Sequence, residues 1–167
     1  MTMTNKKPSM RWREAAWAAV IDVQTATSVM TSPEPHIDRL AVLLLPSEPE
    51  SASTAREFVR EHVGHHVPDA GEAYVDNVLL ITSELVTNSI RYGTKPDDSV
   101  RLVIDTDDRR TRIEVHDPIR RRPRPRPESD QHDRGRGLII LDALCPGQWG
   151  VFDTPPGKAV WAEVKAR

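Results

Sequence analysis

The sequence has 167 residues but only one cysteine and no long apolar run. Cys145 therefore has no disulfide partner within the chain, nothing requires an oxidising compartment, and this thiol is expected to be a small buried hydrophobe. A membrane-spanning helix needs about 20 consecutive apolar residues, which no stretch supplies. The apolar stretch 15–21 is short, rich in alanine and bracketed by acidic residues, unlike the core of a secretion signal. We expect a cytoplasmic protein with no membrane partner.

The sequence also lacks an excess of either charge, since 23 basic residues face 25 acidic residues and the net charge is -2. This balance argues against a chain-wide cationic surface, and we expect no direct nucleic-acid partner. Five arginines gather with prolines at 120–127, which predicts a solvated lid. A phosphate-binding lid and a nucleic-acid contact are less favoured alternatives. The nucleic-acid contact ranks last because no aromatic residue is interleaved for base stacking.

Length and composition predict one domain with an extension. A chain of 167 residues is about one domain's worth. The hydrophobic fraction of 38% and the mean hydropathy of -0.51 indicate a compact core and a poorly ordered remainder. We assign that remainder to residues 1–37, a flexible N-terminal extension in which 12–23 has apolar residues at helical spacing. Residues 38–167 are expected to form the folded domain.

Hydrophobic periodicity predicts the elements of this domain. An apolar run at 40–45 predicts a buried strand, and Ser47 with Glu50 resembles a capping box that starts a helix reaching residue 66. A longer helix should end at Gly93 as its C′ residue. Its stripe, spaced by three and four residues, consists of Tyr74, Val78, Ile81, Leu85, Asn88 and Tyr92. Further strands are expected at 100–106, 112–117, 149–154 and 159–164, a loop at 118–134 and a helix at 135–144.

The order of these elements predicts an α+β fold. A strand, two helices, a hairpin, a loop, a helix and a second hairpin follow one another without an internal repeat. Such an order favours a two-layer α/β sandwich, with helices on one face of a mixed, mostly antiparallel sheet.

Three polar residues of the long predicted helix share one face. Glu84, Asn88 and Arg91 stand at i, i+4 and i+7. The amide oxygen of Asn88 is a hard ligand suited to Mg²⁺, and a carboxylate one turn earlier is placed to accept a proton from a hydroxyl. An ordinary amphipathic helix with one satisfied polar residue explains the same pattern, so both interpretations remain open on these residues alone.

A second group of candidate residues lies further along the chain. Asp117 ends a predicted strand, where carboxylates often reach ligands, and Gly135-Arg136-Gly137-Leu138 begins a predicted helix 18 residues later (135 minus 117). Glycines allow the backbone to approach a phosphate closely, and the N–H groups of a helix N-terminus bind anions. This segment therefore predicts a phosphate contact.

In this order the motifs resemble the GHKL, or Bergerat-fold, ATP-binding domains. They are most similar to the anti-sigma-factor serine/threonine kinases of bacterial partner-switching systems and to their small actinobacterial relatives. The resemblance runs from about residue 40 to residue 164. The stretches that support it are 83–93, 114–118, 133–138 and 149–161.

The resemblance implies roles for individual residues. Glu84 would be the general base for a serine or threonine hydroxyl. Asn88 would hold the Mg²⁺ that bridges the phosphates, and Arg91 would join it on the cofactor side. Asp117 would accept a hydrogen bond from the adenine amino group. The residues that would line the phosphates are Gly135, Arg136, Gly137 and Leu138.

The implied function is an Mg-ATP-dependent serine/threonine kinase that phosphorylates a small anti-sigma antagonist and binds a sigma factor. The resemblance also allows a homodimer. A non-catalytic ATP-binding or partner-sequestering module is the alternative. Two departures from the family favour it: Pro118 lacks a backbone donor, and Ala159 lacks the hydroxyl that often supports the adenine. The catalytic domain of a histidine kinase is disfavoured, because no dimerising helix pair with a phospho-accepting histidine precedes the motifs.

Overall fold

The computed structural model describes residues 39–120 and 136–166. Of Arg136 it describes the backbone and not the side chain. The expected extension 1–37 with its helix 12–23, the lid residues from 121 onward and Gly135 lie outside this part. The described elements are β1 (Leu40–Pro46), α2 (Ser51–His66), α3 (Glu72–Gly93), β2 (Ser99–Thr106), β3 (Arg110–Asp117), α4 (Arg136–Leu144), β4 (Trp149–Asp153) and β5 (Lys158–Lys165).

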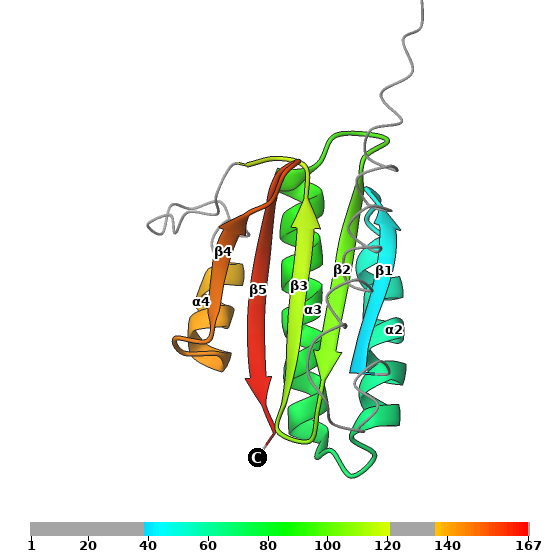
Figure 1. Ribbon diagram of the computed structural model, residues 1–167, viewed down its shortest axis with the longest axis vertical. Coiled ribbons are helices and arrows are strands. Elements are labelled where there is room, and N and C mark those ends of the chain that lie inside the picture. Colours follow the sequence, from blue (N-terminus) through cyan, green and yellow to red (C-terminus); the bar gives the residue numbers. More distant parts are fainter. Residues whose placement is uncertain (1–38, 121–135, 167) are drawn as a thin grey trace, which may run out of the picture. The chain divides into compact units, whose positions relative to one another are not determined.

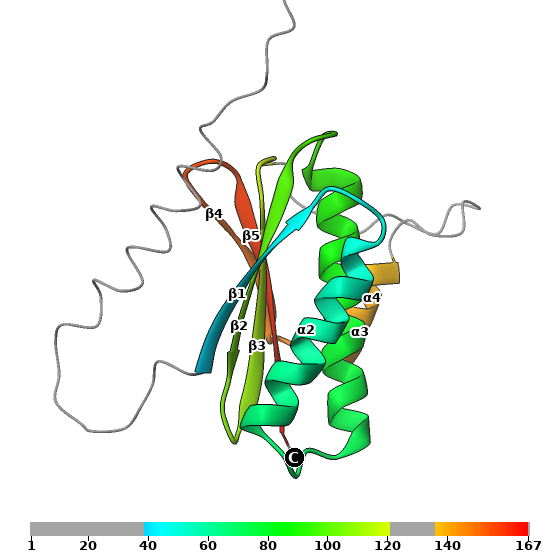
Figure 2. The same cartoon turned by 90° about the vertical axis from the view of Figure 1, so that its right-hand side faces the viewer.

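These elements form two layers. The five strands make one sheet in the order β1-β2-β3-β5-β4, and all four pairings between them are antiparallel (Figure 1). Seen edge-on, the three helices lie on the same face of this sheet (Figure 2). The expected α+β sandwich with helices on one face is therefore confirmed. No helix in the described ranges is long and apolar enough to cross a membrane.

Alternation along the strands builds the core between the layers. In β2 and β3 every second side chain is buried, because successive side chains of a strand point to opposite faces of the sheet. The helices bury their apolar stripes against the same face. The largest fully buried side chains include Leu45, Leu102, Ile104, Ile113, Val59, Val63, Val78, Ile81, Leu85 and Leu141. Cys145 is 1% exposed in this core, as expected, and burial raises the pKa of its thiol to about 11.

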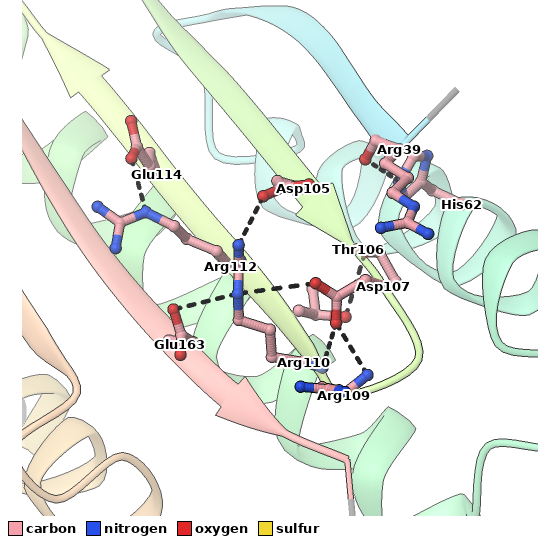
Figure 3. A network of polar contacts seen from close by, with 11 residues as sticks. Arg39, His62, Asp105, Thr106, Asp107, Arg109, Arg110, Arg112, Glu114 and Glu163 are labelled. Atoms are coloured by element: carbon pink, nitrogen blue, oxygen red, sulfur yellow. Dashed lines mark hydrogen bonds and ion pairs between the residues drawn. The ribbon is translucent and has the colours of Figure 1, made fainter. Parts of the chain in front are cut away.

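The other face of the sheet carries charged side chains that pair across the strands (Figure 3). Arg110 contacts Asp105 at 2.9 Å and Glu163 at 3.5 Å, so it joins β2, β3 and β5. Arg112 contacts Glu114 at 2.8 Å and lies over the ring of Trp161, 4.1 Å from its centroid. Partly exposed ion pairs contribute little stability each, so the main effect of these charged side chains is to give the sheet a polar outer face.

Three local predictions about the helices were wrong. No side chain caps α2, because Ser47 hydrogen-bonds Thr94 instead and the helix begins only at Ser51. Gly93 is the last helical residue of α3 and has no positive φ; its missing side chain serves a close contact described below. The polar end of the predicted stripe is also shifted: Asn88 is half-buried, and Ser89 is the residue that faces the interior.

Truncating the middle of the sheet tests this packing. We expect Ile113→Ala to lower the free energy of unfolding by about 2–5 kcal/mol, because Ile113 is fully buried and the substitution leaves a cavity. Leu44→Ala on β1, where the side chain is 54% exposed, should change it by less than about 0.5 kcal/mol. Urea denaturation measures both values, and equal losses would contradict the described core.

Candidate functional site

The C-terminal half of α3 brings two groups of predicted site residues together. Glu84 and Asn88 lie one turn apart on a half-buried face, and Gly137 of α4 packs against both. A Cβ added at Gly137 would lie 2.5 Å from Nδ2 of Asn88 and 3.0 Å from Oε2 of Glu84. Gly137, near the start of α4, therefore lies beside Glu84 and Asn88, although about 50 residues separate them in the chain.

Glycine is required at this contact for a steric reason. Only a residue without Cβ lets the backbone of α4 come this close to an amide and a carboxylate. Leu138, the next residue, is 7% exposed and belongs to the hydrophobic core, which anchors the start of the helix. Leu138 is thus a packing residue in this structure. Arg136 begins α4, and Gly135 lies outside the described residues.

Burial and a nearby cation act in opposite directions on the carboxyl group of Glu84. Burial raises the pKa of its carboxyl above the ordinary value, while the charge of Arg91 acts in the opposite direction. Arg91 itself is exposed, so the structure places it at the rim of this face. The spacing expected from the sequence is therefore reproduced, with two members half-buried and one in solvent.

Asp117 lies at the end of β3 and contacts the last turn of α3. Its side chain is fully buried and accepts hydrogen bonds from Nζ of Lys158, at 2.7 Å on Oδ1 and 2.8 Å on Oδ2. Further hydrogen bonds come from the backbone N–H of Ile119, at 3.1 Å on Oδ1, and from the Ser89 hydroxyl. Burial raises the pKa of Asp117, although these hydrogen bonds and the charge of Lys158 oppose the shift.

Lys158 is the site residue that the sequence analysis missed. It stands directly across from Asp117 in the pairing of β3 with β5 and is 4% exposed. A signal was available, because Lys158 has the same parity as Val160, Ala162 and Val164, which face the core. Ala159 has the opposite parity and is paired with His116 on the other face of the sheet. The residue paired with Asp117 across the two strands is therefore Lys158 and not Ala159, whose lack of a hydroxyl was noted in the sequence.

Two glycines make room for Asp117. A Cβ at Gly93 would overlap the Asp117 carboxylate, lying 2.7 Å from Oδ1 and closer still to Oδ2. A Cβ at Gly157 would overlap the backbone of Asp117 and Pro118. Helix α3 and the β4–β5 turn therefore both approach the end of β3 more closely than any other residue type permits.

Comparison with known proteins agrees with this arrangement. The model of the histidine kinase-like ATPase domain family matches residues 45–147, which is more than half of the chain and includes Glu84, Asn88 and Asp117. The chain belongs to the histidine kinase-like ATPase family. The resemblance found in its motifs is thereby confirmed, and ATP binding is the function common to such domains. No curated protein matches the chain.

A solved structure shows the same fold. The RsbU and RsbW domains of Rv1364c from Mycobacterium tuberculosis superimpose with a TM-score of 0.51 at 18% identity. The match covers 77% of this chain but only 32% of the other, so this chain corresponds to about a third of that protein's length. At this identity the likeness establishes the fold.

The close contact at Gly93 can be tested by a pair of substitutions in helices. Gly64→Ala in α2 places a Cβ in open space and should raise the free energy of unfolding by about 0.5–1 kcal/mol, through the better helix propensity of alanine. Gly93→Ala gains the same propensity but displaces the Asp117 carboxylate, so we expect a net loss of about 1–3 kcal/mol. Stabilisation by both substitutions in thermal or urea melts would show that α3 and β3 are not in contact there.

Proposed function

We propose that this histidine kinase-like ATPase domain is an Mg-ATP-binding regulatory serine/threonine kinase of the anti-sigma-factor type. The observation that carries the proposal is the contact of Gly137 with Asn88 and Glu84, which puts a helix N-terminus beside an amide and a carboxylate. Phosphoryl transfer needs these parts: donors and a cation that spread the phosphate charge, and a group that orients the nucleophile.

Asn88 suits the role of magnesium ligand. Its side chain is half-buried, and its amide nitrogen lies against the backbone of Gly137 near the start of α4. Amide oxygens are hard ligands, and Mg²⁺ usually takes one or two protein ligands together with the phosphates. When bound, the ion would neutralise charge on the transferred phosphoryl group.

Glu84 suits the role of general base. It lies one helical turn from Asn88, and its raised pKa makes it a stronger proton acceptor than an exposed glutamate. In the proposed reaction its carboxylate takes the proton of a serine or threonine hydroxyl as that oxygen attacks the γ-phosphate. Asp117, at the other end of the site, would accept from the adenine amino group.

The motif resemblance to anti-sigma-factor kinases supports the partners. We propose a sigma factor as the bound regulator, a small anti-sigma antagonist as the substrate, and the cytoplasm as the compartment. The solved structure with the same fold contains an RsbW domain beside an RsbU domain, which agrees with a regulatory role.

A non-catalytic nucleotide-binding module is the second candidate. The observation that favours it is the ion pair of Asp117 with Lys158, which already donates to both carboxylate oxygens. Pro118 adds to this, because it offers no N–H beside the site. Transfer of phosphate to a partner protein separates this candidate from the kinase.

Nucleotide binding is tested first. Mg-ATP at about 100 times its Kd should stabilise the protein by about 2.7 kcal/mol, and Asn88→Ala should remove most of that gain because the metal loses its protein ligand. Thermal melts with and without Mg-ATP measure the difference. Asn77→Ala makes the same change near the other end of α3, where it should leave the gain intact. An absent shift at millimolar Mg-ATP in the parent protein would contradict the proposal.

The chemical step is tested at Glu84. Glu84→Gln keeps the shape but takes no proton, so transfer of labelled γ-phosphate to the co-purified antagonist should fall about 10²–10⁴-fold while ATP affinity changes only a few-fold. The rate of the parent should rise with pH until the raised pKa of Glu84 is passed, since only the ionised form accepts a proton. Glu61→Gln on the exposed side of α2 is the matched control. Unchanged transfer in Glu84→Gln would place the base elsewhere.

A further inference from the structure

Asp117 and Lys158 form a buried ion pair between β3 and β5. They are the buried charged residues among those the structure describes, and their side chains are 0% and 5% exposed. Removing two charges from water is costly, and apolar packing of the same volume often gives equal or greater stability. Folding alone therefore does not account for a lysine at this position.

The hydrogen bonds of Asp117 leave no room for another donor. An ionised carboxylate has about four acceptor positions. Lys158 occupies one on each oxygen, the N–H of Ile119 occupies a third, and the Ser89 hydroxyl accounts for the fourth. An adenine amino group can reach Asp117 only after one of these donors withdraws.

Lys158 is the donor best able to withdraw. The N–H of Ile119 is backbone two residues from Asp117, and Ser89 is 3% exposed on the packed side of α3. Lys158 has a flexible four-carbon stem and a third acceptor, the carbonyl oxygen of Ile119 at 2.8 Å. It can therefore release one carboxylate oxygen while two of its three N–H groups remain bonded.

An N–H of Lys158 released in this way would lie beside the carboxylate oxygen that it leaves. Adenine has its ring acceptor N1 next to its amino donor, and the Lys158–Asp117 pair offers a donor next to an acceptor. We propose that Lys158 donates a hydrogen bond to N1 of the bound adenine while Asp117 accepts from the adenine amino group, which makes Lys158 a base-specificity residue. This inference rests on the proposed binding of ATP at this site.

Base analogues test the contact directly. The parent protein should bind 1-deaza-ATP, which lacks N1, about tenfold or more weakly than Mg-ATP, because a hydrogen bond from an ammonium is lost. It should bind 7-deaza-ATP, altered on the other edge of the purine, within a few-fold of Mg-ATP. In Lys158→Met the tenfold preference for ATP over 1-deaza-ATP should disappear, whereas Lys165→Met, exposed near the end of the same strand, should keep it. Titration calorimetry gives all the affinities.

The outcomes separate this inference from the proposed function. Failure of Mg-ATP itself to bind would overturn the proposed function. Binding of ATP and 1-deaza-ATP with equal affinity by the parent, or a preserved tenfold preference in Lys158→Met, would overturn the role of Lys158 alone.

A second measurement needs no variant, in case Lys158→Met leaves Asp117 unpaired and does not fold. Lys158 is the buried lysine of the described residues, so its ¹⁵Nζ signal is expected to be protected from exchange with water. That signal should shift with Mg-ATP and shift differently with 1-deaza-ATP, and identical shifts would contradict the contact.

Discussion

Helix α3 is held against the sheet by one of its faces, and the candidate site depends on that packing. Val78, Ile81 and Leu85 are buried between the layers, which fixes the rotation of the helix about its axis. The direction in which every other side chain of the helix points is then also fixed. Glu84 and Asn88 consequently face α4, and Ser89 and Gly93 face the end of β3.

The polar groups in the buried layer are satisfied at both ends of the sheet. At one end the Tyr74 hydroxyl is bonded to Thr111 at 2.6 Å, and Thr111 in turn lies 3.2 Å from the Thr106 hydroxyl. At the other end Asp117 and Lys158 satisfy each other. A buried polar group without a partner costs about 1–3 kcal/mol, so both ends restrict the register of the strands. Only the end that contains the ion pair adjoins the residues proposed for chemistry.

The glycines of the site act through what they lack. Gly93, Gly137 and Gly157 have no unusual backbone conformation, yet a Cβ at any of them would overlap a neighbouring group. Each allows one element to approach another: α3 and the β4–β5 turn approach Asp117, and α4 approaches Glu84 and Asn88. The sequence pattern singled out Gly137 for a phosphate contact, which stays a prediction, and it assigned Gly93 to a helix cap because a glycine after a helical stripe is usually a C′ residue.

The amino-acid sequence by itself determined the order and kind of every described element, because hydrophobic periodicity and turn residues are local properties. It also determined the shared face of Glu84 and Asn88, which follows from helix geometry. Only the tertiary structure decided that Lys158 pairs with Asp117 and that Gly93 is a contact. These facts depend on strand register and on the approach of segments distant in the chain, and both are set by the packing of the whole core rather than by neighbouring residues.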